Sequence, residues 1–565
     1  MSMWQPFSYG FRWDVSLMNK HESGRISPVL SETMNRVKAD FTDCADVVMK
    51  ELYVGKNHYP IYMVYMDSMI ARELVETDIL KMLMFSMGEV PKEKPLEFIR
   101  DYGMTTADVK ADSDYYSALK SMMSGDTLIF VDGSAQVLVL DSKGYPNRGV
   151  QSAESEVAIH GPKDSFTESM RVNTVLIRRR IRDTRLKSVQ LVKGVRTKTD
   201  ISIMYMEDLV QTDILEELQQ RLDDFEIDGI FDSGSLEQLL EKEWYSPFPQ
   251  FQSTQRPDKA SSALLEGRIV VVADNSPEVL LLPAVAGCFY QAADDYYNRW
   301  DIACFTRILR YIASILAFSL PGLYIAIASF HPEVFPTSLA LSFAASRQGV
   351  PFPLAVEVLL MELAFELLRE AGIRLPGPMG GTLGIVGGLI IGQAAVEANI
   401  VSPIVVIVVA LTALSAFTIP TEGFATAFRL VKFYLIFLSM FLGIFGFVLG
   451  VLTLLIHLAS LESFGVPYMM PFTAAEVNGG SDRRDGFLRR PLRDMKKRPV
   501  FTRPGARRRL IMPINGGQPR GGARQNSSQP GSDAGQSSGQ PGNGGQPRGG
   551  AAAAPKPQGN EKKEG

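Results

Sequence analysis

The chain has 565 residues, which is too many for one ordinary domain, and its formal net charge is only -4. Three scattered cysteines, Cys44, Cys288 and Cys304, exclude a disulfide framework. Five isolated histidines, no G-x-x-x-x-G-K-[ST] loop and no G-x-S-x-G elbow exclude the common metal-site, nucleotide-loop and hydrolase patterns. The sequence therefore predicts no catalytic site, no cofactor and no metal centre.

Apolar residues are concentrated in one part of the chain. Residues 1–295 are rich in Asp, Glu, Lys and Arg, whereas the residues from about 303 to 461 are mostly apolar. The first twenty residues include Arg12 and Asp14 and have no uninterrupted apolar core, so we expect no signal peptide there. We expect a soluble α/β half on the cytoplasmic side, followed by an all-α, multi-pass membrane domain and a disordered tail.

The soluble half contains an internal duplication. Residues 62–67 (YMVYMD) precede ETDIL at 76–80, and residues 203–208 (IMYMED) precede QTDIL at 211–215. Each copy reads as a strand that ends in an acidic residue and leads into a helix. The copies are about 140 residues apart, which is the size of one domain.

A second pair of similar stretches is separated by about the same number of residues. GDTLIFVD at 125–132 corresponds to GRIVVVAD at 267–274, and each continues into a second apolar run. We interpret both as β-hairpins with turns at Asp132-Gly133-Ser134 and at 274–277. Chance similarity is the alternative, but two such pairs in the same order predict related subdomains at 41–165 and 166–295.

A basic cluster, Arg178-Arg179-Arg180, follows the first subdomain. Acidic residues flank it and no aromatic stacking platform accompanies it, so the sequence predicts no nucleic-acid binding. We expect this cluster to be an interface, either with a neighbouring subunit or through ion pairs between the two subdomains.

Five apolar segments make up the expected membrane domain, 296–470. They are 303–330, 352–370, 380–398, 400–420 and 431–461. The segments that begin at 400 and 431 have about 20 apolar residues or more, enough to cross a bilayer. The first segment carries Arg307 and Arg310 near its start, and we expect it to kink at Pro321.

The segment from Pro351 to Pro376 is apolar but carries several carboxylates. At roughly 100° per residue, Glu362, Glu366 and Glu370 fall within about 80° of one another on a helix, and Glu357 precedes them. Ionisable groups in a membrane segment usually face a bundle interior or a water-filled path. The four glutamates are candidates for an ion path or a gate.

An ion-pair interpretation of the same segment stays open. Glu366 and Glu370 have Arg369 and Arg374 at i+3 and i+4, which would satisfy buried charge within the helix. A subunit interface is a third possibility for this acidic face.

A glycine ridge lies in the next segment, where Gly380, Gly384, Gly388 and Gly392 recur every four residues. Small residues at this spacing let two helices approach closely in lipid. The ridge would pack helices within the chain or form a seam between subunits.

The region after the apolar segments is expected to be a basic juxtamembrane segment at 471–514. By the positive-inside rule this flank is cytoplasmic, and its charge suits contact with anionic membrane lipid. Both ends then lie inside, which requires an even number of crossings. We expect four spans, with 352–370 re-entrant, interfacial or buried around an aqueous path. Against this, a crossing 352–370 would place Arg369, Arg374, Arg429 and Lys432 on the inner side.

The ends of the chain differ from its middle. Residues 1–40 form an N-terminal extension, and residues 515–565 form a tail rich in Gly, Gln and Pro that repeats GGQPRGG. The tail has almost no apolar residues, and we expect it to be disordered.

Several long stretches resemble the A subunit of the GerA-type spore germinant receptors, over about 41–475. They are DSFTESMRVNTVLIRRRIRDTRL (164–186), LPGLYIA (320–326) with His331-Pro332-Glu333, PFPLAVEVLLMELAFELLREAGIRLP (351–376), IVGGLIIGQAAVEANIVSP (385–403) and SFGVPY (463–468). Stage V sporulation protein AF shares the domain plan, but the intact REAGIRLP and PFP segments favour the receptor subunit. The tail departs from the family pattern.

The resemblance implies a multi-pass protein of the spore inner membrane that acts in nutrient-triggered germination. Its partners would be a transporter-like B subunit and a lipoprotein C subunit, and several A subunits would form a homo-oligomer that conducts ions. A non-conducting scaffold that assembles other germination proteins is the alternative. A secondary transporter is disfavoured, because the apolar region is too short for two inverted halves.

Overall fold

The computed structural model describes residues 24–104, 108–145, 156, 160–374, 387–388, 391–473, 483–486 and 488–510. The tail 515–565 and two of the ridge glycines, Gly380 and Gly384, lie outside the described residues.

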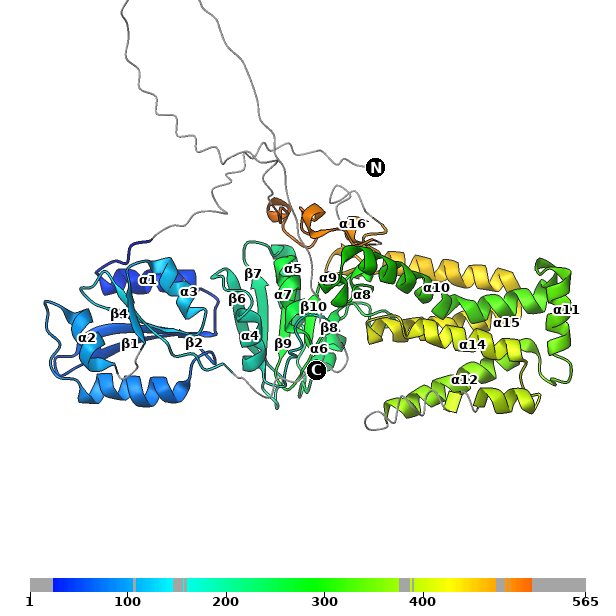
Figure 1. The fold of residues 1–565 in the computed structure, drawn as a ribbon, viewed down its shortest axis with the longest axis horizontal. Helices are drawn as coiled ribbons and strands as arrows, with labels where there is room; N and C mark the ends of the chain where they lie inside the picture. The colour runs from blue at the N-terminus through cyan, green and yellow to red at the C-terminus, as the bar shows by residue number, and fades with distance from the viewer. Residues whose placement is uncertain are drawn as a thin grey trace, which may run out of the picture. The chain divides into compact units, whose positions relative to one another are not determined.

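The first α/β unit is built on a five-stranded antiparallel sheet with the strand order β1-β2-β4-β5-β3. Figure 1 shows this unit in blue, with helices beside its sheet. Its strands are β1 (Val47–Val54), β2 (Tyr59–Met66), β3 (Val109–Asp112), β4 (Thr127–Val131) and β5 (Val137–Leu140). Its helices are α1 (Leu30–Asp40), η2 (Leu74–Leu80), η3 (Met82–Ser86), α2 (Pro95–Gly103) and α3 (Tyr115–Met122). The predicted hairpin is β4–β5, with Gly133 at φ 76° in its turn.

The second α/β unit repeats this topology. Its antiparallel sheet has the order β6-β7-β9-β10-β8, which is the first order with each strand number raised by five. Its strands are β6 (Leu186–Lys193), β7 (Thr199–Met206), β8 (Gln252–Thr254), β9 (Ile269–Ala273) and β10 (Val279–Leu282). Its helices are α4 (Met170–Arg178), α5 (Thr212–Asp223), α6 (Ser233–Leu240), α7 (Pro257–Leu265), α8 (Ala286–Phe289) and α9 (Asp294–Tyr297). The prediction of an α/β half with antiparallel hairpins is confirmed.

Both faces of each sheet are covered, because alternate side chains of a strand point to opposite faces. In the second unit, Ile203 packs with α5 and α6 while the adjacent Met204 packs with α4 and α7. In the first unit, Leu30 and Val37 of α1 are buried beside Tyr62. The expected extension 1–40 therefore includes a helix that belongs to the first core.

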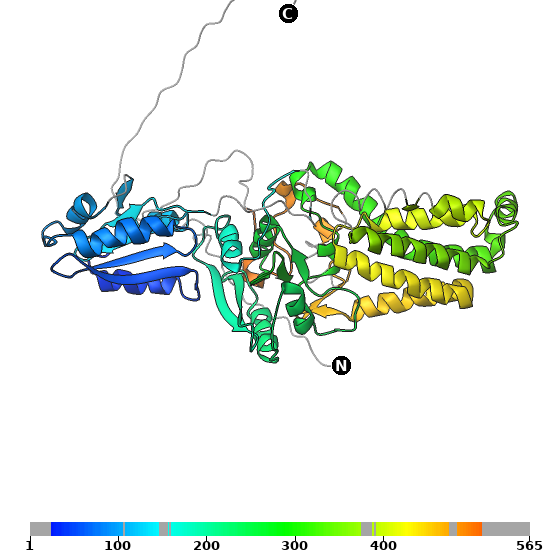
Figure 2. The same ribbon diagram turned by 90° about the horizontal axis from the view of Figure 1, so that it is seen from below.

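The C-terminal half is a group of helices (Figure 2). They are α10 (Trp300–Phe330), η4 (Pro332–Val334), α11 (Thr337–Ser346), α12 (Leu354–Ile373), α14 (Pro403–Ala416) and α15 (Glu422–Ser460). α10 packs against α12, α14 and α15, and α12 packs against α14. α10 continues through Pro321, where a kink was expected. Among the described residues, α10 and α15 are long and apolar enough to cross a membrane.

α15 is a helical hairpin, whereas the sequence predicted one apolar segment at 431–461. Gly443 has φ 59° and ψ -138°, which interrupts the helix. The two arms lie side by side, because the Tyr434 hydroxyl is 2.9 Å from Thr453 Oγ1 across the turn. A β-carbon added at Gly443 would lie 2.8 Å from Phe330 Cγ at the end of α10, so the turn has no room for a side chain.

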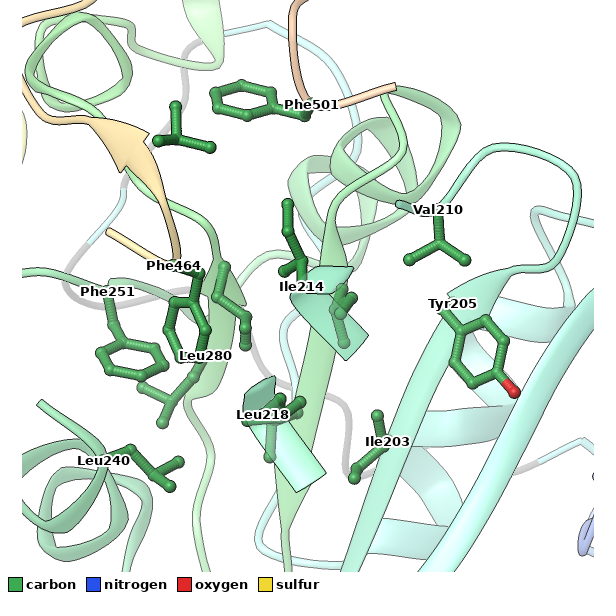
Figure 3. Packing of buried hydrophobic residues seen from close by; sticks show 14 of the residues in the cluster. Ile203, Tyr205, Val210, Ile214, Leu218, Leu240, Phe251, Leu280, Phe464 and Phe501 are labelled. Carbon is green, nitrogen blue, oxygen red and sulfur yellow. The ribbon is translucent and has the colours of Figure 1, made fainter. Parts of the chain in front are cut away.

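The chain returns to the second α/β unit after the helices. Its last elements are β11 (Glu462–Ser463), β12 (Val466–Pro467), α16 (Arg483–Gly486), η5 (Leu492–Asp494) and η6 (Pro504–Ala506). Phe464 and Phe501 are buried in the same hydrophobic cluster as Leu218 and Leu280 (Figure 3). Gln211 Nε2 donates to the Val500 carbonyl at 2.7 Å. This part of the basic segment is thus folded against protein, where contact with lipid was expected.

Candidate functional site

The acidic face of α12 is the candidate site. Pro353 precedes the first residue of the helix, where its fixed φ favours a helix start, and the helix runs to Ile373. All four predicted glutamates lie on this one helix. The structure brings each of them to a basic side chain, and three of those contacts reach beyond α12 and its C-cap residue Arg374.

Glu362 forms a buried ion pair with Lys432 on the first arm of α15. The distance from Glu362 Oε2 to Lys432 Nζ is 2.6 Å, and the side chains are 2% and 7% exposed. The other carboxylate oxygen, Oε1, is buried and has no hydrogen-bond partner among the described residues. A buried charge is costly unless it is paired, so each residue of this pair depends on the other.

Glu366 lies one turn further along and contacts two arginines. Its Oε1 is 2.6 Å from Arg369 Nη2, as the i+3 spacing predicted, and 3.0 Å from Arg429 Nη1 on α15. Its side chain is 31% exposed. Glu366 therefore joins α12 to α15 at the edge of the helix group.

Glu357 is the most buried of the four acids, with no exposed surface. Its Oε1 is 3.2 Å from Arg347 Nε, and its Oε2 accepts a 2.9 Å hydrogen bond from the backbone N–H of Ser402. Ser402 is the N-cap residue of α14, where unpaired N–H groups favour a negative charge. Glu357 thus holds the start of α14 against α12.

Glu370 pairs with Arg374 at 2.7 Å, as the i+4 spacing predicted. Its side chain is 59% exposed, and an exposed pair of this kind contributes little to stability. Exposure therefore increases along α12 from Glu357 to Glu370. The inner two acids hold helices together, and the outer two reach the surface of the single chain.

The two described ridge glycines pack within the chain. A β-carbon at Gly388 would lie 3.4 Å from Phe365, and one at Gly392 would lie 3.2 Å from Val406. These contacts fit the intramolecular alternative for this part of the ridge.

The arginine cluster also makes contacts within the chain. Arg178 donates two hydrogen bonds to Asp46 of the first α/β unit, at 2.6 and 2.9 Å, and both residues are buried. The Arg179 guanidinium lies 5.3 Å from the ring centre of Tyr145. Arg180 contacts Asp164 at 2.7 Å. The Arg178–Asp46 pair joins the two α/β units.

A second buried charge cluster was not predicted. Arg307 of α10 has no exposed surface and contacts Asp295 at 3.2 Å and Asp485 at 3.1 Å. The Tyr296 hydroxyl donates to Asp485 at 2.9 Å. Burial raises the pKa of Asp485, and the nearby Arg307 opposes that rise. Asp485 stands next to Arg483-Arg484 at the start of the basic segment, and an acid in this setting was the signal that could have predicted a buried ion pair.

This cluster fixes the start of α10 to the end of the second α/β unit and to the C-terminal segment. It is a structural junction, because every charged group in it has an oppositely charged neighbour. Among the described residues there is no group of three or more His, Cys, Asp or Glu side chains that could hold a metal ion.

Comparison with known proteins gives a consistent set of relatives. The family described as Bacillus/Clostridium GerA spore germination protein matches residues 35–501. The chain is 38% identical to spore germination protein KA of Bacillus subtilis (strain 168), over 84% of this chain and 87% of the relative. It is 34% identical to spore germination protein GerLA of Bacillus cereus, over 84% and 95%. It is also 36% identical to the uncharacterized membrane protein YfkQ of Bacillus subtilis, over 86% and 93%.

One solved structure is also similar. It is the crystal structure of the N-terminal domain of the A subunit of the Bacillus megaterium spore germinant receptor GerK3. The match has 28% identity and a TM-score of 0.37, and it covers 46% of this chain and 98% of that chain.

Proposed function

Because the chain belongs to the GerA family of Bacillus/Clostridium spore germination proteins, we propose that it is the A subunit of a receptor that starts germination when nutrient binds. Its partners are a transporter-like B subunit and a lipoprotein C subunit. We assign it no enzymatic role. The length and identity of the matches to curated germination proteins support the proposal.

We place the helical half in the spore inner membrane as a multi-pass domain, with both α/β units on the core side. The apolar length of α10 and α15 supports this placement. The first arm of α15, residues 422–442, is about 30 Å long as a helix, which equals the hydrocarbon thickness of a bilayer. The two arms of the hairpin would account for two crossings.

Several copies of the chain would assemble around an axis and conduct cations. The observation that supports this proposal is the exposure of acids along α12, from 0% for Glu357 to 59% for Glu370. In an assembly, Glu366 and Glu370 are the acids accessible to a water-filled path, and rings of carboxylates favour cations. Glu357 and Glu362 serve to position the helix.

The test compares Glu366→Gln and Glu370→Gln with Glu397→Gln. Glu397 is an exposed acid on the neighbouring segment and does not lie on α12. Spores that carry each variant as their single receptor receive a mixture of amino acids, sugars and nucleosides, and potassium release is followed. We expect slower release for the α12 variants only. Unchanged release with unchanged receptor amounts would remove the acidic ring from the proposal.

The scaffold alternative keeps a specific observation in its favour. Every candidate acid is already paired with a base inside one chain, as a purely structural helix would require. Conductance of the full chain in planar bilayers, with and without the B and C subunits, separates the two functions. A scaffold gives no conductance in either case.

A further inference from the structure

A groove lies where the second α/β unit meets the α15 hairpin. It has a volume of about 470 Å³, which is within the range of pockets that hold small molecules. Its walls come from the loop before β8 and from both arms of α15. The lining residues used below are Tyr245, Phe248, Leu430, Tyr434, Thr453 and His457.

The polar side chains Tyr434, Thr453 and His457 of this groove already have hydrogen-bond partners. The Tyr434 hydroxyl is paired with Thr453, and His457 Nε2 is 2.9 Å from Ser246 Oγ. Phe248 packs edge-on against Phe428 with ring centres 5.8 Å apart. A polar ligand would find its possible partners occupied, whereas a hydrocarbon chain would bury apolar wall and displace water.

The groove is continuous with an exposed apolar surface. On the first arm Leu430 is 59% exposed and Phe437 is 61% exposed, and on the second arm Ile456 is 60% exposed. Neighbouring exposed apolar side chains of this kind are typical of an interaction surface. On the membrane placement proposed above, these side chains face lipid.

Amphipathic aromatic residues mark the polar end of this surface. Trp244 is 79% exposed and its ring lies 6.1 Å from that of Tyr245, whose ring lies 6.4 Å from His457. The other tryptophan in the described ranges, Trp300, is the first residue of α10 and is 49% exposed. Trp and Tyr concentrate where a membrane meets water, because the ring is apolar and its N–H or O–H is polar.

We propose that this groove is a phospholipid site. One acyl chain lies between the two arms of α15 beside Tyr434 and Thr453, while Trp244 and Tyr245 lie at the level of the headgroups. The loop 244–248 thereby couples the second α/β unit to the lipid. This inference rests on the membrane placement under the proposed function.

The first test locates Trp244. The full chain is reconstituted in phosphatidylcholine–phosphatidylglycerol vesicles whose acyl chains are brominated near the headgroup, and tryptophan fluorescence is compared with that in unbrominated vesicles. Subtracting the signal of Trp244→Phe isolates Trp244, and subtracting that of Trp300→Phe isolates Trp300. We expect both components to be quenched at least twofold.

The two components separate the proposals. Quenching of Trp300 without quenching of Trp244 leaves the membrane placement in place and overturns the lipid site, as would happen if a second protein covered the groove. Quenching of neither component overturns the membrane placement and the site together.

The second test asks whether the groove itself holds lipid. Leu430 lines the groove, whereas Phe437 lies two turns further along the same arm and is similarly exposed. Native mass spectrometry of the detergent-purified full chain counts retained phospholipids. We expect Leu430→Trp to lose one phospholipid per chain and Phe437→Trp to keep it. Equal retention by both variants, or equal loss from both, overturns the site.

Discussion

Replacing Glu362 with Gln should destabilise the helical half strongly. The substitution keeps the shape of the side chain but removes the negative charge 2.6 Å from Lys432 Nζ, and the Lys432 side chain is only 7% exposed. Removing one partner of a buried ion pair costs about 3–5 kcal/mol. At roughly 2–4 °C per kcal/mol for a unit of about 150–250 residues, we expect melting about 6–20 °C lower.

The assay is thermal unfolding of the full chain in detergent, read as the monodisperse fraction that survives heating. Glu370→Gln is the matched control, because Glu370 is an exposed acid on the same helix and its loss costs about 1 kcal/mol or less. The double variant Glu362→Leu with Lys432→Met removes both charges and should recover most of the lost stability. The reasoning is refuted if Glu362→Gln melts like the control, or if the double variant is no more stable than the single one.

Three further variants test other parts of the fold. Asp46→Asn leaves the buried Arg178 without its carboxylate, so we expect a loss of about 3 kcal/mol and faster hydrogen exchange in β1 and α4. Gly443→Ala places a β-carbon 2.8 Å from Phe330 at a positive φ, and we expect about 1–3 kcal/mol of destabilisation. Burial raises the pKa of Glu237 to about 8, so the folded state holds a proton that the unfolded state releases above about pH 4.5. Stability therefore falls as pH rises from 5 to 8, and the advantage of Glu237→Gln over the parent should grow across that range, by at most about 1.4 kcal/mol per pKa unit.

Each of these variants has its own control. Asp101→Asn removes an acid from an exposed pair and should leave hydrogen exchange unchanged. Gly423→Ala is the control for the hairpin, because a β-carbon there meets only Pro249 at 3.8 Å. Unchanged exchange in Asp46→Asn, or equal melting of the two glycine variants, would contradict those predictions. An advantage of Glu237→Gln that is the same at pH 5 and pH 8 would contradict the third.

Local patterns in the sequence predicted the α/β half well. In this half, β-branched runs such as Ile269–Ala273 form buried strands, and Asp132-Gly133-Ser134 forms a turn through the conformational freedom of glycine. The repeat of these runs about 140 residues later predicted two related units, and the two sheets indeed share one strand order. The sequence also predicted the acidic face of α12, since helical spacing alone places Glu362, Glu366 and Glu370 on one side of the helix.

Only the tertiary structure showed which residues the α12 acids contact and where α15 folds back on itself. Glu362 finds its base 70 residues away on α15, and no local pattern encodes that distance. The hairpin at Gly443 was missed because an apolar run gives the same composition whether a helix crosses once or folds on itself. Val500 and Phe501 were hidden in a basic segment, yet they return to the second core because burying them removes apolar surface from water. Spacing along the chain therefore determined the elements and their faces, whereas pairing of buried charges and packing of distant apolar residues determined how those faces meet.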